Sequence, residues 1–410
     1  MKKKLLDVIA LFIAITGVTH AVAQNDVSSI LTTDKGYQKI STMPEVVDDY
    51  YYVIIEHTQQ LMISLENSSY QGDANKTWKY RSPVDPLTDF SKIWMIETNN
   101  GVNNASGYAF RNVSEKDYVM QTEWNSGYNF RTNDQSSPCE WSQFLFNYTN
   151  DGYWTFENGK YPMSSSATYK GYIGIWEEKE GIIEGAEVAA NKSGNYIGQY
   201  DLYAINKSAF WKAYLEKNEN TFDANILIIN PNFTVKNGIG TWSSTTKAQN
   251  NGRALKTFGI FNNEYIYENW NGKPFSGTMS QTIKGLPNGK YELKAGAFRE
   301  GGNEDVRLFA NSDETPITTT SSNASYFTVT TSVTNHNLTI GLKSVNNGCN
   351  WMGLGKVSLR YLGPDLSSLI TEFENLKKSL EELAGTTSGI DNIINNTLNQ
   401  ILLHLVNKPI

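Results

Sequence analysis

Apolar and polar residues alternate with a period of two in the last third of the chain. Tyr291, Leu293, Ala295 and Ala297 alternate with residues 292, 294, 296 and 298. The same alternation recurs in three shorter runs, at 306–310, 338–342 and 357–361. This period is typical of half-buried strands. Several short strands at close spacing, with no helical pattern between them, predict an antiparallel β-sandwich over residues 223–363.

Residues 45–206 show a different pattern, in which short apolar strands are separated by Asn, Gly, Ser and Asp. The run 93–99 resembles 144–150, and a Gly-Tyr unit follows each, at Gly107 and Gly152. Trp94, Leu145 and Tyr203 recur at intervals of 51 and 58 residues. Repeats of this size predict several supersecondary units that share one core. A three-repeat barrel fits best, and a sandwich or an irregular barrel is the alternative.

Helical patterns are confined to two places. Residues 207–222 include Phe210, Trp211, Tyr214 and Leu215, which predicts a short linker helix. Residues 364–410 carry leucine and isoleucine at three-four spacing with a break at Gly385, which predicts a helical tail of two amphipathic helices. The two helices could close on the sandwich, self-associate or bind a protein partner.

The N-terminus has the pattern of an export signal. Three lysines precede a short apolar run, and 21–23 reads Ala-Val-Ala. We expect a signal peptide at 1–23 and an extracellular, cell-surface or periplasmic protein. The run is too short to predict a membrane span. Cleavage would remove three lysines and Asp7, which takes the formal net charge from −7 to −9. That sign argues against nucleic-acid or anionic-membrane binding and favours a neutral ligand.

The order of motifs between residues 225 and 363 resembles the galactose-binding-like modules that bacteria of the Bacteroides and Prevotella kind attach to secreted glycan-handling proteins. The motifs that carry the resemblance are NPNF at 230–233, WNGKPF at 270–275, MSQTI at 279–283, GLPNGKYELKA at 285–295, CNWMGLG at 349–355 and VSLRYL at 357–362. The resemblance implies a jelly-roll β-sandwich and a glycan partner. The first domain resembles the ricin-type β-trefoil, with degraded forms of its Gln-x-Trp triplet at 92–94, 143–145 and 201–203. The expected fold class is therefore mainly β, a trefoil followed by a jelly roll.

The galactose-binding-like resemblance also implies ligand residues in loops at one end of the sandwich. The matching positions are Trp270, Asn271, Arg299, Asn350 and Trp351, with Phe298 and Glu300 beside them. We expect Trp270 to stack on a sugar ring, and Arg299 and Asn350 to bond its hydroxyls. Core packing is an equal alternative for Trp351.

A second candidate site lies in the first domain. The segment 123–134 joins aromatic residues to amides and an arginine, and Trp124 and Asn125 are its candidate ligand residues. Trp124 could instead plug the bottom of the barrel.

Motifs for enzyme chemistry are missing from the sequence. His57, His336 and His404 have no metal-ligand spacing, and there is no G-x-S-x-G elbow or phosphate loop. We expect no catalytic residues and no cofactor, although a structural Ca²⁺ could use Asp223, Glu264 and Glu268, as in related modules. The function expected is a non-catalytic carbohydrate-binding protein. A glycosidase or its accessory part, with acids at 177, 178 and 184, and an adhesion protein are the alternatives.

Overall fold

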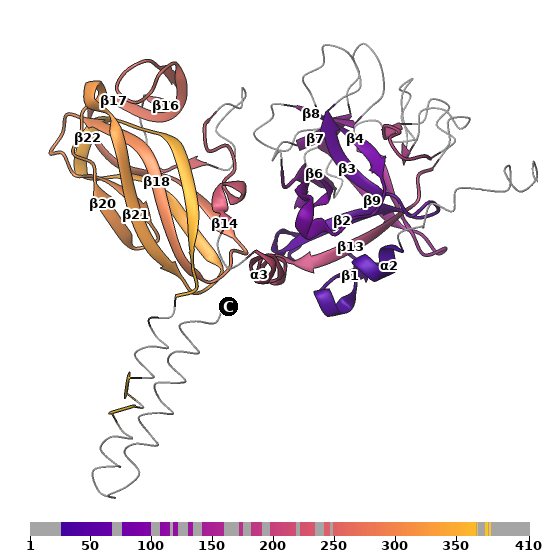
Figure 1. Cartoon of the computed structure of the whole chain (residues 1–410). Helices are drawn as coiled ribbons and strands as arrows, with labels where there is room; N and C mark the ends of the chain where they lie inside the picture. The colour runs from indigo at the N-terminus through magenta and orange to yellow at the C-terminus, as the bar shows by residue number, and fades with distance from the viewer. Residues whose placement is uncertain are drawn as a thin grey trace, which may run out of the picture.

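The computed structural model is mainly β and consists of a closed barrel and an open antiparallel sheet that lie side by side (Figure 1). The structure describes residues 26–67, 76–99, 107–114, 118–121, 130–133, 142–159, 172–174, 182–190, 197–218, 222–233, 242–246, 249–365, 367, 374–375 and 377–378. Three predictions fall outside these residues: the signal peptide at 1–23, the site at Trp124 and Asn125, and nearly all of the helical tail. No helix among the described residues is both long and apolar enough to cross a bilayer.

Six strands close the barrel into a ring. In chain order they are β2 (Tyr50–Glu56), β5 (Trp94–Thr98), β6 (Tyr108–Asn112), β9 (Phe144–Tyr148), β10 (Trp154–Asn158) and β13 (Tyr200–Asn206). Each strand pairs antiparallel with the next, and β13 returns to β2 along its whole length, from Tyr200↔Glu56 to Asn206↔Tyr50. Closure leaves the ring itself without an unpaired strand edge.

The ring is built from three successive units of four strands. Each unit places a hairpin between two ring strands: β3 (Met62–Asn67) with β4 (Lys76–Arg81), β7 (Tyr118–Gln121) with β8 (Phe130–Asn133), and β11 (Ile173–Gly174) with β12 (Ala189–Ala190). Within the units, the ring strands meet at Tyr52↔Trp94, Tyr108↔Phe144 and Trp154↔Tyr200. The repeat inferred from sequence is therefore present as a repeated topology.

The structure corrects the positions at which the repeats correspond. Trp94 is equivalent to Phe144 and Tyr200, and not to Leu145 and Tyr203 as the sequence intervals suggest. Trp94, Phe144 and Tyr200 are all buried in the barrel core, whereas Leu145 and Tyr203 are only half-buried. A shift of one residue along a strand turns a side chain to the other face, and sequence similarity alone did not fix that register.

The barrel core is rich in aromatic side chains. Trp78 from the β3–β4 hairpin is fully buried, and its ring centroid lies 4.9 Å from that of Trp94 and 5.0 Å from that of Phe110. Aromatic pairs at such distances add to the free energy gained by burying their surface. The hairpin thus supplies a large side chain to the centre of the barrel.

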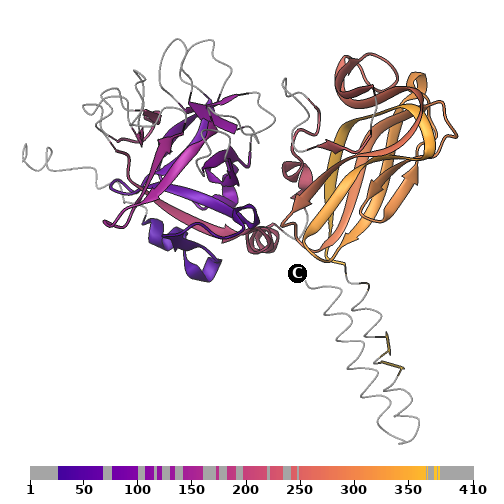
Figure 2. The same ribbon diagram turned by 180° about the vertical axis from the view of Figure 1, so that it is seen from behind.

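The second unit is an open antiparallel sheet dominated by two long strands, β17 (Glu264–Lys284) and β22 (Asn337–Gly363). Both strands change neighbours along their length. Residues 264–270 of β17 pair with β16, and 279–280 pair with β15. Residues 340–344 of β22 pair with β19, and 351–363 pair with β18. The other strands are β14 (Phe222–Asp223), β15 (Ser243–Ser244), β16 (Asn250–Lys256), β18 (Gly289–Glu300), β19 (Val306–Ala310), β20 (Asp313–Pro316) and β21 (Ser325–Val333). Figure 2 shows these strands from the other side.

The alternation predicted for residues 291–298 is correct only in part. Tyr291, Leu293, Ala295 and Ala297 are buried in the main core, and Glu292 and Lys294 are not. Phe298, however, is fully buried on the opposite face, where residues 258–261 fold over the sheet. A local sequence pattern cannot reveal a covering loop from another part of the chain.

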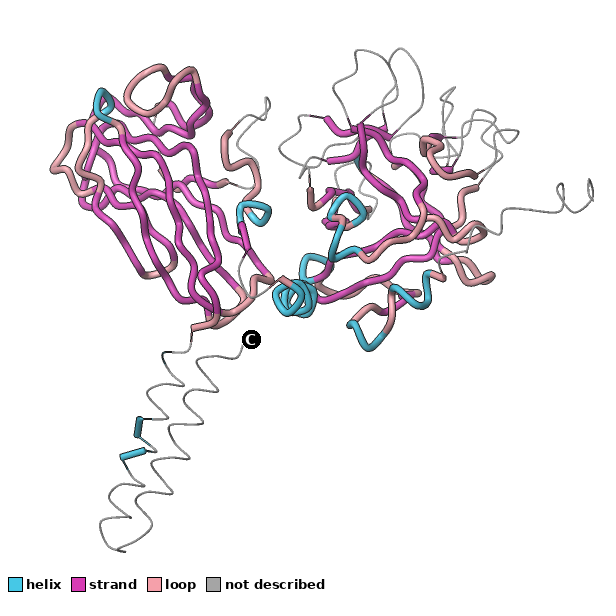
Figure 3. The backbone as a smooth tube through the Cα atoms, in the orientation of Figure 1, coloured by secondary structure: helices cyan, strands magenta, loops and turns pink. Residues whose placement is uncertain are grey.

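A short helix, α3 (Lys207–Lys217), connects the barrel to the sheet, and Figure 3 shows it between the two magenta units. Its residue Trp211 is fully buried and stacks on Phe222 with a centroid distance of 5.0 Å. One apolar cluster runs from Tyr51 of the barrel through α3 to Leu293 of the sheet. The helix lies in the stretch predicted for a linker helix, whereas the predicted domain limits stay predictions.

Cys349 is expected to be unreactive in the folded protein. The thiol is free and buried in β22, and burial raises its pKa to about 11. Since the thiolate is the nucleophile, we expect alkylation at pH 8 to be roughly 100-fold slower than in the unfolded chain. Peptide mass spectrometry after timed alkylation would measure this residue separately from Cys139. Equal rates with and without denaturant would contradict the prediction.

Candidate functional site

Four side chains form a row across four neighbouring strands of the open sheet. Trp270 of β17 is the register partner of Asn250 in β16 and of Trp351 in β22, and Trp351 is in turn the partner of Glu300 in β18. Register partners in antiparallel strands point to the same face of a sheet. The outer row, as we call Asn250, Trp270, Trp351 and Glu300, therefore presents two indoles flanked by an amide and a carboxylate.

Trp351 is held in the outer row by packing. Its ring centroid lies 4.8 Å from that of Phe298 and 5.7 Å from that of Phe258. Gly353 makes the packing possible, since a Cβ there would lie 2.3 Å from Cε1 of Phe298. The core packing that the sequence left open for Trp351 is therefore present on one side of its ring. The residue as a whole stays half-buried.

Trp270 is the exposed member of the pair. Its side chain is 39 % exposed, and within the part of the chain that the structure describes it makes no side-chain hydrogen bond and no ring contact. A large aromatic side chain that is neither buried nor partnered leaves a flat apolar surface in contact with water. Such a surface is what an aromatic stacking partner requires.

Charged groups lie beside Trp351. Glu268 accepts a hydrogen bond from Nε1 of Trp351 at 2.8 Å and forms an ion pair with Nζ of Lys256 at 2.8 Å. Lys256 in turn lies 5.1 Å from the centroid of the Trp351 ring. Glu300 accepts hydrogen bonds from the backbone N–H and the hydroxyl of Ser321. These bonds fix the positions of both carboxylates beside the indoles.

The other residues implied by the resemblance lie apart from the outer row. Arg299 alternates with Glu300 and is only 8 % exposed; it donates to the Ile317 carbonyl and to Glu304, each at 2.8 Å. Asn350 alternates with Trp351 and lies against Gly301, and Asn271 follows Trp270 at the start of an irregular stretch of β17. The structure thus brings together Trp270 and Trp351, and it does not bring Arg299, Asn350 or Asn271 onto their face.

The candidate calcium ligands are also separate. Asp223 caps a short helical turn, Glu264 forms an ion pair with Lys356, and Glu268 belongs to the surroundings of Trp351. Among the residues that the structure describes, no group of three metal-binding side chains comes together.

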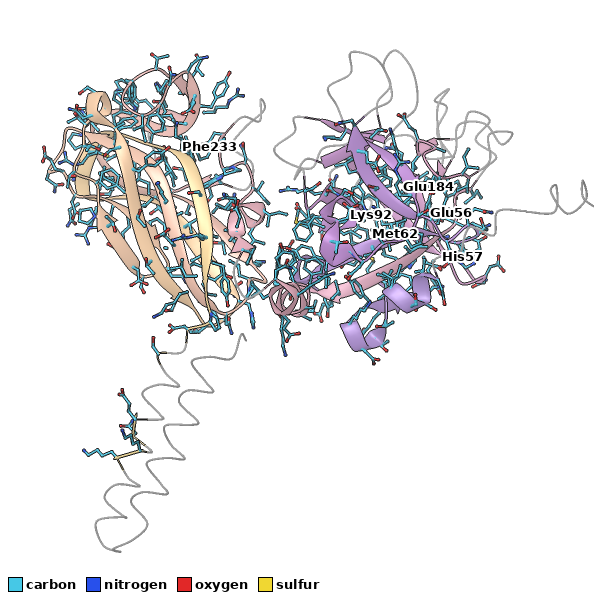
Figure 4. The ribbon with its side chains drawn as sticks, viewed as in Figure 1. Glu56, His57, Met62, Lys92, Glu184 and Phe233 are labelled. Carbon is cyan, nitrogen blue, oxygen red and sulfur yellow. The ribbon has the colours of Figure 1, made fainter. Side chains whose placement is uncertain are left out.

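A polar cluster also lies on the barrel, on the side turned away from the sheet (Figure 4). Nδ1 of His57 is 2.8 Å from Oδ1 of Asp201, which also pairs with Nζ of Lys39 at 2.9 Å. Neighbouring Glu56 is buried and accepts hydrogen bonds from Thr58 and from the backbone N–H of Gln59. These bonds tie the turn after β2 to β13, so the cluster has a structural role.

The sequence did not single out Asn250 and Lys256. Both lie on β16, whose pattern of small and polar residues has no clear period. No local signal could have found them, because strand pairing brings them beside β17. The sequence could only have placed Glu268 and Trp270 on one face, since they lie two residues apart on one strand.

Comparison with known proteins gives distant structural similarities only. No family model and no curated protein matches the chain. A cyclase from Fischerella sp. TAU is 14 % identical with a TM-score of 0.28, covering 34 % of this chain and 96 % of its own. The carbohydrate-binding module TmCBM61, solved in complex with β-1,4-galactotriose, is 18 % identical with a TM-score of 0.26, covering 32 % and 96 %. A mosquitocidal holotoxin is 12 % identical with a TM-score of 0.28, covering 59 % and 25 %.

Proposed function

We propose that this protein binds a glycan without cleaving it, and that the outer row is the binding surface. The observation that carries the proposal is the pairing of exposed Trp270 with the half-buried, packed Trp351 on one face. The C–H face of a sugar ring is apolar and can lie on an indole, while fixed acceptors such as Glu300 and the amide of Asn250 can bond its hydroxyls.

The proposal extends to the folds and to localisation. The barrel, with its three four-stranded units, is proposed to be a β-trefoil resembling the ricin type. The open sheet is proposed to be a galactose-binding-like jelly roll. The N-terminal signal pattern supports export, and the helical tail at 364–410 is proposed to contact a protein partner or a second copy.

In this proposal Glu300 and Asn250, and not Arg299 and Asn350, bond the hydroxyls of the sugar. Arg299 is engaged with Ile317 and Glu304, so we propose that it supports the loop at 301–305 and does not reach the sugar. Glu268 and Lys256 neutralise each other beside Trp351, which suits a neutral sugar better than a charged one.

Removing the indole of Trp270 is expected to weaken glycan binding by about 10- to 30-fold, since a central aromatic contact contributes about 1.4–2 kcal/mol. The measurement is a glycan array, with β-1,4-galactan oligosaccharides included, followed by calorimetry on the best ligand. The variant Trp270→Ala would be compared with Leu255→Ala. Leu255 is a matched control because it is 47 % exposed on β16 but lies five residues from Asn250, on the other face.

Two outcomes would count against the proposal. Equal affinity of Trp270→Ala and the unchanged chain would remove the outer row as the site. The absence of binding to any glycan would favour the adhesion alternative, and release of reducing sugar from a bound polysaccharide would favour the glycosidase alternative.

A further inference from the structure

A cavity of about 410 Å³ lies where the barrel meets the open sheet. Its barrel side comes from η2 (Val47–Asp49), β2 and β5, and its sheet side comes from η7 (Ala224–Leu227) and the end of β17. The walls are mixed: Val47, Tyr51, Met95, Leu227, Ile229 and Ile283 are among the apolar lining residues, and the polar ones include Glu45, Asp48, Glu97, Thr98, Lys207 and Lys284. This volume is within the range of cavities that hold small organic ligands.

One buried cation lines this cavity. Lys207, the first residue of α3, is only 7 % exposed, and its Nζ lies 5.4 Å from the centroid of the Tyr51 ring. Its stem is fixed by the turn at Gly285, where a Cβ would lie 2.4 Å from Cβ of Lys207. Among the described residues, none accepts a hydrogen bond from Lys207 or forms an ion pair with it.

The acidic side chains around the cavity already have nearer partners or lie at its rim. Asp48 pairs with Lys284 at 3.4 Å, and Glu97 pairs with Arg111 at 3.2 Å. Glu45 is exposed at the mouth, and Asp49 is also exposed. Burial lowers the pKa of Lys207, and the more distant Asp48, Glu97 and Asp49 oppose that effect. A lysine that is only 7 % exposed and has neither a hydrogen-bond acceptor nor an ion-pair partner among the described residues is costly to keep charged, so a counter-ion would stabilise it.

We propose that the junction cavity binds a small organic carboxylate, with the carboxylate on Lys207 and the apolar body of the ligand against Tyr51, Met95 and Ile283. The hydroxyl of Thr98 and the carboxylate of Asp48 line the same cavity and would suit hydroxyls on the ligand. This inference does not rest on the proposed glycan site, because the outer row shares no residue with the cavity. A uronic acid and an aromatic acid both have the required chemistry.

The test uses the full chain and pairs of probes that differ in charge. D-galacturonate would be compared with D-galactose, and benzoate with benzyl alcohol, by ligand-observed NMR and calorimetry. We expect at least one carboxylate to bind and its uncharged counterpart to bind at least tenfold more weakly. Binding of galacturonate alone would identify a sugar acid, and binding of benzoate alone an aromatic acid. Failure of both carboxylates to bind would overturn the proposal.

Substitution of Lys207 tests whether this residue binds the carboxylate. Lys207→Met keeps the apolar stem and removes the charge, and we expect at least a tenfold loss of carboxylate affinity. Lys217→Met is the matched control, since Lys217 lies at the other end of α3 on the surface, paired with Asp85 at 3.0 Å. Unchanged affinity in Lys207→Met would overturn the proposal.

A measurement on the unchanged chain guards against misfolding of the variant. Timed acetylation followed by peptide mass spectrometry would compare Lys207 with Lys217. The bound carboxylate is expected to slow labelling of Lys207 at least threefold and to leave Lys217 unaffected. Equal labelling of Lys207 with and without the carboxylate would contradict the assignment.

Discussion

Replacing Trp78 by alanine is expected to lower the free energy of unfolding of the barrel by about 4 kcal/mol. The side chain is fully buried and contacts the rings of Trp94, Phe110 and Phe144. Truncation would leave a cavity that those rings, fixed in three different strands, cannot fill. Urea unfolding followed by circular dichroism would measure the loss.

The same substitution at Trp270 is the matched control for stability. Because Trp270 is 39 % exposed and has no ring partner among the described residues, we expect its removal to cost about 1 kcal/mol or less. A loss at Trp78 no larger than the loss at Trp270 would mean that the β3–β4 hairpin does not fill the barrel as described.

Replacing Trp211 by alanine is expected to cost about 3–4 kcal/mol and to uncouple the unfolding of the barrel from that of the sheet. The indole stacks on Phe222 of the sheet unit and donates from Nε1 to the Tyr51 hydroxyl of the barrel at 3.0 Å. Its removal therefore breaks contacts on both sides of α3 at once. Scanning calorimetry should show one coupled transition in the unchanged chain and two separate transitions in the variant.

The neighbouring substitution Lys212→Ala controls for effects on the helix itself. Lys212 is exposed on α3, and alanine favours helix formation, so we expect a change within about 0.5 kcal/mol and a single transition. A single unshifted transition in Trp211→Ala would contradict the view that α3 couples the two units.

Periodicity in the sequence predicted much of the fold. The alternating runs at 291–297, 306–310, 338–342 and 357–361 lie in β18, β19 and β22, and the helix Lys207–Lys217 lies in the predicted stretch. The last two runs belong to one long strand, β22, and the pattern of β16 gave no signal. These elements are recognisable because the period of a strand or helix is a local property. The register between repeats was predicted wrongly, because pairing is set by contacts between distant segments.

The alternation in the sequence could have shown which candidate ligand residues lie on the outer face of the sheet and which on the inner face. Arg299 continues the series Tyr291, Leu293, Ala295 and Ala297, so the alternation itself places it on the inner face, whereas Glu300 belongs to the outer one. The resemblance to a family drew attention to neighbouring residues without regard to face. Odd and even positions along β18 point to opposite faces, which separates Arg299 from Glu300.

Two features could not be predicted from the sequence. Trp351 packs under the loop at 258–261 only because glycines on two strands leave room for that loop. The junction cavity combines residues near 48, 97, 207, 227 and 283, which no local pattern connects. Both depend on how separate segments pack.

If a glycan lies on the outer row, the indole N–H signals of Trp270 and Trp351 should report its binding. Trp270→Phe and Trp351→Phe would assign their two signals in a ¹⁵N-labelled sample, and the best glycan from the array would then be titrated. We expect the Trp270 and Trp351 signals to shift and those of the buried Trp78, Trp94 and Trp211 to stay unchanged. A bound glycan that leaves the Trp270 and Trp351 signals unmoved would contradict it.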